Sequence, residues 1–225
     1  MAGPLLLYYI TDRTYFSGDE AERRPKLLAK ISEAAACGVD FIQLREKDLS
    51  TRELETLAYQ ALEAIRRREP SNQKPETRLL INSRSDLALA VGADGVHLRS
   101  KDISLSDARN VRKISKDQNL KEGNWIVAVS CHSEAEVLLA AAEAADFVVL
   151  APVFAKAALE KNYGTSPAGL EALRRACRHP VPVLALGGVT MENARSCFDT
   201  GAAGIAGIRI FQENDISEVV RRLRG

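Results

Sequence analysis

Cationic side chains recur in short polar segments, and each of these segments directly follows an apolar run. They are Arg45, Lys47, Arg84, Arg99, Lys101, Lys156 and Arg209. Arginine offers phosphate a planar fork of paired N–H donors, whereas lysine offers a compact point charge. A fold that gathers these segments at one place would therefore build a binding site for a phosphorylated ligand.

The pair Gly187-Gly188 is a second feature that suits phosphate, because it lies between an apolar run and a helical pattern. Glycine has no Cβ, so its backbone N–H groups can approach an anion closely. Phosphates are often bound where such a turn leads into a helix. The pair is a weak signal by itself, and its position in the pattern described below gives it weight.

Two histidines are candidates for proton transfer. His132 follows an apolar run and precedes a helix-start signal, which predicts an exposed imidazole that titrates near neutral pH. His97 lies within an apolar run, which is more typical of a buried structural histidine. Ser130, Cys131 and His132 do not predict a nucleophilic triad, because adjacent strand residues point to opposite faces and no orienting carboxylate is evident.

The elements that must position these residues alternate along the chain. Apolar runs predict eight strands, over residues 5–11, 40–44, 78–82, 95–98, 125–130, 147–151, 181–186 and 203–208. Apolar residues at i, i+3 and i+4 predict eight helices, over residues 25–37, 51–67, 85–91, 105–114, 134–144, 168–177, 191–200 and 216–223. Strands that are apolar throughout, such as 181–186, are typical of a parallel sheet covered on both faces.

This alternation predicts an α/β fold, a single (β/α)8 TIM barrel that spans residues 1–225 as one domain. A doubly wound open sheet is the alternative, and it is disfavoured because no Gly-x-Gly-x-x-Gly segment follows the first predicted strand. In a TIM barrel the C-terminal ends of the strands form the active site. Two polar insertions, 68–77 and 116–123, follow no strand and should lie away from that face.

Signals at helix ends support these boundaries. Residues 50–53 and 133–136 have the Ser-x-x-Glu spacing of a capping box. In such a box the serine hydroxyl accepts the backbone N–H of the glutamate, and the glutamate carboxylate accepts the backbone N–H of the serine. Gly38 and Gly201 lie where helices should end, since glycine adopts a positive φ at little cost.

Composition excludes several classes of protein. Lys+Arg 31 against Asp+Glu 30 gives a net charge of +1, which offers no basic field for duplex nucleic acid or an anionic membrane. No run approaches the roughly 20 apolar residues of a membrane helix, and no signal peptide is evident. Four cysteines without a C-x-x-C pair are typical of reduced thiols. We therefore expect a cytoplasmic protein whose partners are small molecules, and a homo-oligomer is compatible with these features.

Several segments together resemble the thiamine-phosphate synthase/TenI superfamily. The matching segments are residues 8–13, 43–47, 82–84, 92–98, 130–133, 152–154, 185–189 and 201–206, so the resemblance covers nearly the whole chain. It implies a TIM barrel and a transferase of thiamine biosynthesis. The synthases join an aminopyrimidine diphosphate to a thiazole phosphate, and pyrophosphate leaves with Mg²⁺ assistance through a carbocation-like pyrimidine intermediate.

The resemblance also implies roles for individual residues. In synthases the residues matching Gln43, Arg45, Lys47 and Asn82 hold the diphosphate and the pyrimidine, and the thiazole phosphate sits on the Gly-Gly loop and the eighth strand. The predicted catalytic residues are His132, Arg45 and Lys47; the predicted substrate-binding residues are Gln43, Asn82, Arg84, Ser130, Lys156, Gly187, Gly188, Ile208 and Arg209; the predicted metal ligand is Asp102.

The predicted metal site departs from the synthase pattern. Ser83 stands where synthases have an aspartate that helps to bind Mg²⁺. Asp102 matches the second carboxylate, but it follows Arg99-Ser100 where synthases have Gly-Gln. Because Mg²⁺ sites often rest on one or two carboxylates, the loss of one should weaken binding. Asp102 is equally well explained as the start of the helix over 105–114.

The loops that follow strands six and eight depart as well. The Thr-x-Thr-Lys segment after Pro-Val-Phe is missing, so that either Lys156 or Lys161 could replace its lysine. Arg209 occupies the usual serine position at the phosphate site.

These departures leave two alternatives open. A TenI-like tautomerase would aromatise a thiazole carboxylate phosphate by proton transfer at His132, and it would need no cofactor. A barrel that binds thiazole phosphate or thiamine phosphate without turnover would carry the same altered motifs. We favour a synthase, with Mg²⁺ held at a weakened site, because the intact diphosphate-binding residues have no evident use in a tautomerase.

Overall fold

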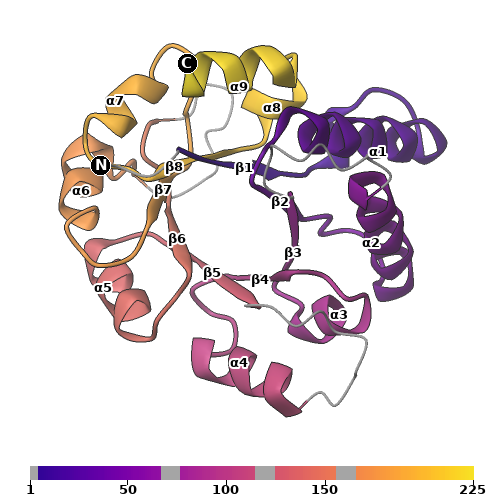
Figure 1. The fold of residues 1–225 in the computed structure, drawn as a ribbon, viewed down its shortest axis with the longest axis horizontal. Coiled ribbons are helices and arrows are strands. Elements are labelled where there is room, and N and C mark those ends of the chain that lie inside the picture. The colour runs from indigo at the N-terminus through magenta and orange to yellow at the C-terminus, as the bar shows by residue number, and fades with distance from the viewer. Residues whose placement is uncertain (1–4, 67–76, 115–124, 156–165) are drawn as a thin grey trace.

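The computed structural model describes residues 5–66, 77–114, 125–155 and 166–225. Its strands form one closed barrel of eight parallel neighbours in sequential order (Figure 1). They are β1 (Leu6–Ile10), β2 (Phe41–Leu44), β3 (Arg78–Asn82), β4 (Gly95–Leu98), β5 (Ile126–Cys131), β6 (Phe147–Leu150), β7 (Val183–Ala185) and β8 (Gly204–Gly207). Because β1 pairs with both β2 and β8, the predicted (β/α)8 barrel is confirmed and the open sheet is excluded.

Helices surround this barrel in Figure 1. They are η1 (Arg13–Tyr15), α1 (Glu20–Cys37), α2 (Thr51–Arg66), α3 (Ser85–Ala90), α4 (Leu105–Ile114), α5 (Glu134–Ala142), α6 (Gly169–Ala176), α7 (Ala194–Phe198), α8 (Arg209–Gln212) and α9 (Ile216–Arg224). None of the helices in the described ranges has the length and the apolar character that crossing a membrane requires.

Alternation along the strands separates two apolar cores. In β1, Tyr8 and Ile10 belong to a small cluster inside the barrel, whereas Leu7 and Tyr9 join the large cluster between strands and helices. Near the N-terminal ends of the strands, Phe41 and Phe147 lie 4.8 Å apart between ring centroids, and the ring of Tyr8 packs edge-on against both. These rings fill the interior of the barrel at the N-terminal ends of the strands.

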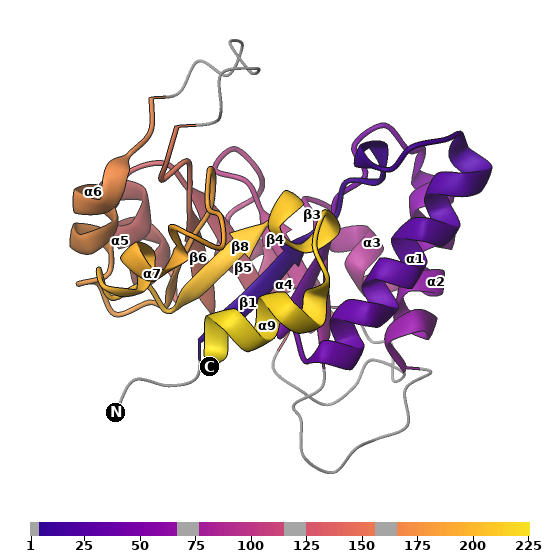
Figure 2. The ribbon, with the colours of Figure 1, turned by 90° about the horizontal axis from the view of Figure 1, so that it is seen from above.

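Polar contacts also stabilise the barrel at the N-terminal ends of its strands. Arg224, in α9, donates to the carbonyl oxygen of Leu5 at 3.1 Å and to that of Gly38 at 2.8 Å, and it forms an ion pair with Asp40. The end of α9 therefore lies beside the beginning of β1 (Figure 2).

The predicted strands agree with the structure, whereas some helix boundaries differ. Helix α1 was expected to begin at Pro25 and begins at Glu20, because the Asp19 carboxylate accepts the backbone N–H of Glu22 at 3.1 Å. Helix α7 is shorter than the predicted 191–200, and the single turns η1 and α8 were not predicted. Apart from Thr77, the predicted insertions 68–77 and 116–123 lie outside the described residues.

The predicted helix-end signals are confirmed with one change. Ser50 and Glu53 form a reciprocal capping box, and Gly38 and Gly201 have φ of 80° and 97°. In the second predicted box, Ser133 accepts the N–H of Glu136 at 3.2 Å, but the Glu136 carboxylate accepts the N–H of His132 rather than that of Ser133.

Candidate functional site

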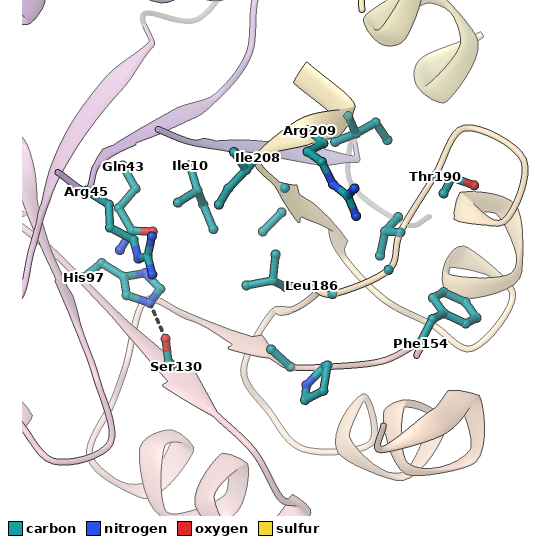
Figure 3. A pocket seen from close by; sticks show the side chains of 18 of the residues that line it. Ile10, Gln43, Arg45, His97, Ser130, Phe154, Leu186, Thr190, Ile208 and Arg209 are labelled. Carbon is teal, nitrogen blue, oxygen red and sulfur yellow. Dashed lines mark hydrogen bonds between the residues drawn. The ribbon is translucent and has the colours of Figure 1, made fainter. Parts of the chain in front are cut away.

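A pocket of about 1100 Å³ opens at the C-terminal ends of the strands (Figure 3). Every strand or the residue after it contributes to the floor: Ile10, Gln43, Asn82, His97, Ser130, Ala151, Leu186 and Ala206. Since parallel strands all end at one edge, residues distant in sequence meet here. Ten of the predicted site residues line the pocket: Gln43, Arg45, Lys47, Asn82, Ser130, His132, Gly187, Gly188, Ile208 and Arg209.

The floor of the pocket is divided into a polar and an apolar half. On neighbouring strands β2 and β3, Gln43 donates from Nε2 to Asn82 Oδ1 at 3.0 Å. The next two strands, β4 and β5, add His97 and Ser130. Ile10, beside Gln43 on the neighbouring strand β1, and Leu186, after β7, offer apolar surface, as Figure 3 shows. The amide pair fixes hydrogen-bonding groups for a polar ring, and the apolar half suits the less polar part of a ligand.

His97 is buried, as predicted for a structural histidine, and it also faces the ligand space. Its Nδ1 lies 3.0 Å from Tyr8 Oη and its Nε2 lies 2.7 Å from Ser130 Oγ. Burial, and then the charge of Arg45, lower the pKa of His97 to about 3, so the ring is neutral at physiological pH. Burial raises the pKa of the Tyr8 phenol, which therefore keeps its proton.

One arrangement of protons satisfies every buried donor in this chain of contacts. Tyr8 donates its O–H to His97 Nδ1, and the Nε2–H of His97 donates to Ser130 Oγ. The reverse tautomer would leave the Tyr8 O–H without an acceptor. In the satisfied arrangement the Ser130 hydroxyl proton is free to bind a ligand in the pocket.

Cations surround the mouth of the pocket. Arg45 and Lys47 follow β2, Arg99 and Lys101 follow β4, and Arg209 begins α8. Figure 3 shows Arg45 beside His97 and Gln43, with Arg209 on the opposite side near Thr190. The sequence-based expectation that these segments gather at one place is confirmed for these five residues.

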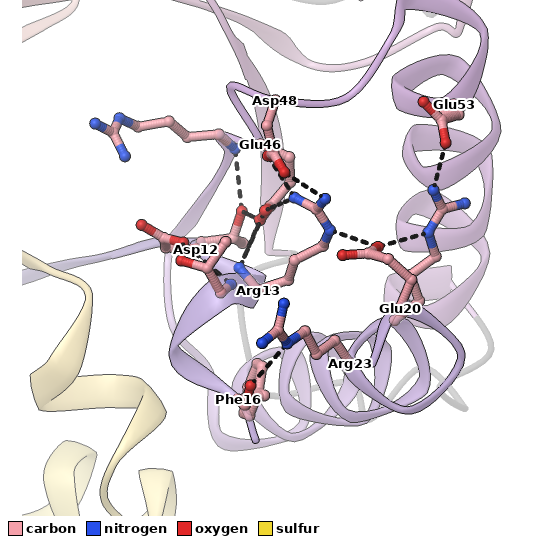
Figure 4. Close-up of polar contacts among 12 residues, drawn as sticks. Asp12, Arg13, Phe16, Glu20, Arg23, Glu46, Asp48 and Glu53 are labelled. Carbon is pink, nitrogen blue, oxygen red and sulfur yellow. Dashed lines mark hydrogen bonds and ion pairs between the residues drawn. The ribbon is translucent and has the colours of Figure 1, made fainter. Parts of the chain in front are cut away.

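The direction of Arg45 and Lys47 follows from the strand alternation, which continues beyond β2. The intervening Glu46 points away from the pocket, and its side chain is 1% exposed. It accepts hydrogen bonds from Thr11 Oγ1 at 2.6 Å and from the backbone N–H and Nη1 of Arg13 at 3.0 and 3.1 Å (Figure 4). Burial raises the pKa of the Glu46 carboxyl, and these hydrogen bonds oppose the rise.

Arg13 is the centre of this cluster. It is buried, and its guanidinium forms a fork with both oxygens of Asp48, each at 2.7 Å, and bonds Glu20 at 2.9 Å. The hydrogen bonds from Arg13 lower the pKa of Asp48. Every second residue of the segment 45–48 is therefore anchored to Arg13, which leaves Arg45 and Lys47 directed to the pocket.

His132 presents a defined tautomer. Its Nδ1 lies 2.7 Å from the carbonyl oxygen of Ala151, and a carbonyl only accepts, so Nδ1 carries the proton. In the neutral ring Nε2 then holds a lone pair. Ser130 and His132 both line the pocket, whereas Cys131 is buried on the other side and burial raises its pKa to about 12. The predicted alternation of these three residues is confirmed.

The predicted glycine pair forms a tight turn at the pocket. Gly187 and Gly188 have φ of 91° and 65°, and a Cβ on either would lie 2.7 Å from Pro152 or Phe154. The turn is held by Asn193, whose Nδ2 donates to the carbonyl oxygen of Gly188 at 2.9 Å and whose Oδ1 accepts the N–H of Thr190 at 2.8 Å. Only glycine fits at both positions, which keeps backbone groups at the ligand space.

Two predicted site residues, Arg84 and Asp102, do not join the pocket lining, and a third is not among the described residues. Arg84 forms a fork with Asp86 at 2.9 and 2.8 Å and bonds Thr51, so its guanidinium lies over α2 and α3. Asp102 lies behind Arg99 and does not begin α4, since Ser104 accepts the N–H of Asp107; the helix-start explanation was wrong. Lys156, like its alternative Lys161, lies outside the described residues.

Sequence reasoning missed several residues at the rim: Tyr15, Phe154, Thr190, Glu192, Glu213 and Asn214. All come from loops or short turns, where no apolar period indicates the direction of a side chain. For the loop that carries Thr190 and Glu192, the glycine pair was the available signal in the sequence, because Gly187 and Gly188 adopt the positive φ of a tight turn.

Comparisons with known proteins agree on one family. A family model described as thiamine monophosphate synthase matches residues 7–211. The Aquifex aeolicus protein named "Putative thiamine-phosphate synthase 2" is 38% identical over 92% of this chain and 97% of its own. The thiamine-phosphate synthase of Methanoculleus marisnigri is 34% identical over 97% of this chain and 93% of its own. The solved structure of a thiamine phosphate pyrophosphorylase from Pyrococcus furiosus has 29% identity and a TM-score of 0.75, covering 98% of this chain and 94% of that one.

Proposed function

Since the chain belongs to the thiamine monophosphate synthase family, we propose that its pocket joins an aminopyrimidine diphosphate to a thiazole phosphate and releases pyrophosphate. The protein is thus a transferase of thiamine biosynthesis. The observation that carries the proposed site is the arrangement of two cationic regions on opposite sides of one pocket of about 1100 Å³. One region follows β2 and β4, and the other adjoins the Gly187-Gly188 turn and Arg209.

The first region suits the diphosphate. Arg45 and Lys47 point into the pocket from the anchored segment after β2, and Arg99 and Lys101 adjoin them. As the C–O bond to the diphosphate breaks, negative charge grows on the leaving oxygen, and fixed cations stabilise that charge. Because Glu46 and Arg13 hold the segment before substrate arrives, little reorganisation accompanies the reaction.

The polar floor suits the aminopyrimidine. Gln43 and Asn82 are fixed by their mutual hydrogen bond, and Ser130 offers a hydroxyl donor. A carbocation-like pyrimidine intermediate would be destabilised by a positive charge below it. The low pKa of His97, about 3, keeps that ring neutral, so that it carries no positive charge that would repel the developing cation.

The second region suits the thiazole phosphate. Gly187 and Gly188 bring backbone groups to the ligand space, Ile208 adds an apolar contact, and Arg209 supplies a charge. In the proposed reaction the thiazole nitrogen faces the floor and attacks the pyrimidine methylene carbon. The bonding pair of the C–O bond leaves with pyrophosphate, and the lone pair of the nitrogen then forms the new C–N bond to the carbocation-like pyrimidine.

The residues present do not fit the Mg²⁺ ion that synthases of this family use. Asp102 matches one of the two expected carboxylates, and both its oxygens accept hydrogen bonds from Arg99. Ser83 offers a hydroxyl where a second carboxylate is expected. Within the described residues no group of three or more His, Cys, Asp or Glu side chains could hold a metal ion. We therefore assign no step to a metal.

A direct assay tests the proposed reaction. The purified chain is incubated with aminopyrimidine diphosphate and thiazole phosphate, with Mg²⁺ or with EDTA, and thiamine phosphate is followed. Product at enzymatic rates supports the synthase. Binding of both substrates without product in either condition would contradict it and would leave a binding protein or a tautomerase.

A tautomerase is the second candidate, and the His132 geometry favours it. With Nδ1–H held by the Ala151 carbonyl, Nε2 can accept a proton from a ligand and return it. His132→Ala should abolish aromatisation of a thiazole carboxylate phosphate while the affinity for that phosphate stays within about threefold. Unchanged turnover in this variant would remove His132 from such a mechanism.

A further inference from the structure

The loop after β4 holds an ion pair at the edge of the pocket. Arg99 donates from Nη2 and Nε to Asp102 Oδ1 at 2.9 and 3.2 Å, and its backbone N–H donates to Oδ2 at 2.8 Å. The Asp102 side chain is 9% exposed, whereas that of Arg99 is 61% exposed and lines the pocket. The carboxylate is thus withdrawn behind the guanidinium, which faces the ligand space.

A second chain of contacts connects this carboxylate to the polar floor. Asn82 donates from Nδ2 to Ser83 Oγ at 3.2 Å, and the Ser83 side chain hydrogen-bonds Asp102. Burial raises the pKa of Asp102, but the hydrogen bonds from Arg99 and Ser83 outweigh it and lower the pKa overall. Asp102 is therefore an anion whose charge is balanced by Arg99.

A divalent cation would meet two obstacles here. Mg²⁺ requires oxygen ligands at about 2.0–2.1 Å, and Arg99 already engages both oxygens of Asp102. Arg45, Lys47 and Lys101 line the same pocket and would repel a further cation. Ser83 contributes no charge to compensate.

The guanidinium itself has the donors that a diphosphate needs. Of its five N–H groups, one on Nε and one on Nη2 face Asp102. Three remain, two on Nη1 and one on Nη2. Because the pair with Asp102 fixes the plane of the guanidinium, these donors are oriented before a ligand binds.

We propose that Arg99, anchored by Asp102, takes the place of the divalent cation at the diphosphate of the substrate. The inference rests on the proposed synthase reaction. The bond between the pyrimidine methylene carbon and the diphosphate oxygen breaks, its electron pair leaves with pyrophosphate, and the thiazole nitrogen supplies the pair for the new C–N bond. Arg99 donates hydrogen bonds to the leaving pyrophosphate and keeps all its protons. The reaction therefore proceeds without a metal ion at Asp102.

Binding of inorganic pyrophosphate to the full chain, measured by calorimetry in EDTA and in Mg²⁺, tests this role. The parent should bind in EDTA, and Mg²⁺ should change its Kd by less than about threefold. Arg99→Gln should weaken binding in EDTA by about tenfold or more. Arg195→Gln is the matched control, since Arg195, on α7, forms an exposed pair with Asp199 just after that helix, and it should bind like the parent. Tenfold tighter binding by the parent in Mg²⁺, or parental affinity in Arg99→Gln, would overturn the proposal.

Turnover distinguishes this inference from the proposed reaction. The parent should form thiamine phosphate at similar rates in EDTA and Mg²⁺. The double variant Ser83→Asp/Arg99→Gln restores a second carboxylate and frees Asp102, and its rate should rise at least about tenfold on adding Mg²⁺; position 83 has φ of 60°, which aspartate tolerates. If the parent forms product only in Mg²⁺, the role inferred for Arg99 is wrong, whereas the proposed synthase reaction is supported. If the parent binds pyrophosphate in EDTA but forms no product in either medium, the proposed synthase reaction is wrong, and so is the role of Arg99 in the transfer step.

Discussion

At the residue scale, the site depends on keeping one buried ring uncharged. His97 sits between Tyr8 and Ser130, and its pKa is lowered to about 3 by burial and by Arg45. The same ring charges with a pKa of about 6.5 in the unfolded chain. The unfolded chain therefore takes up a proton at pH values where the folded chain does not.

This difference predicts a pH dependence of stability. The contribution of His97 is fully present above pH ~6.5 and is lost as pH falls toward about 3, with a slope that approaches about 1.4 kcal/mol per pH unit. Urea unfolding of the parent and of His97→Gln between pH 4.5 and 7.5 measures it. The variant should show a shallower dependence on pH. Parallel curves for the two proteins would show that His97 is not the group that titrates.

Arg45 is the residue whose loss should affect the diphosphate most directly. It lies beside His97 and Gln43 at the pocket (Figure 3), and a hydrogen bond to a charged group contributes about 1.5–3 kcal/mol. Arg45→Ala should weaken the affinity for aminopyrimidine diphosphate by roughly 10- to 100-fold. Calorimetry measures that Kd, with thiazole phosphate as a control ligand whose Kd should stay the same. Equal affinity of variant and parent for the diphosphate would exclude this role.

At the element scale, the barrel strands were predictable because each buries both faces and ends at a turn. The short elements were not, because η1 and α8 are single turns without a period of their own. A position after a strand also does not fix where a side chain points. Arg84 and Arg99 both follow strands, yet Arg84 lies on Asp86 whereas Arg99 faces the pocket. Partners distant in sequence, such as Thr51 for Arg84, help to decide the direction, and the sequence pattern does not contain them.

The segment after β2 illustrates how an element positions a site, and Glu46 tests it. Glu46→Gln keeps the shape but removes the charge that accepts hydrogen bonds from Arg13 and Thr11. We expect the free energy of unfolding to fall by about 2 kcal/mol, and the KM for the diphosphate to rise although Glu46 does not face the pocket.

Glu20→Gln is the matched control for that variant. Its carboxylate bonds the same Arg13, but its side chain is 48% exposed, so the change should be within about 1 kcal/mol. Urea unfolding and steady-state kinetics measure both variants. If Glu46→Gln destabilises the protein but leaves the KM unchanged, then the cluster around Arg13 is structural and does not position Arg45 and Lys47.

At the scale of the whole molecule, barrel closure brings segments that follow the first and the last strands to one pocket. Because β8 pairs with β1, Arg209 and the Gly187-Gly188 turn line the same pocket as the cations that follow β2. The two regions proposed to bind anions therefore share a volume without sharing residues. Two ligands should be able to bind at once, each stabilising the folded chain by its own affinity.

Thermal unfolding with inorganic pyrophosphate and thiazole phosphate measures this independence. A ligand at about 100 times its Kd stabilises a protein by about 2.7 kcal/mol, which raises the Tm of a chain of this size by roughly 5–10 °C. We expect the two increments to add. Arg209→Ala should lose most of the thiazole phosphate increment and keep the pyrophosphate increment, because Arg209 lies across the pocket from Arg45. If saturating thiazole phosphate instead abolishes the increment from pyrophosphate, both anions compete for one site, and the pocket does not hold the two substrates that a transfer between them requires.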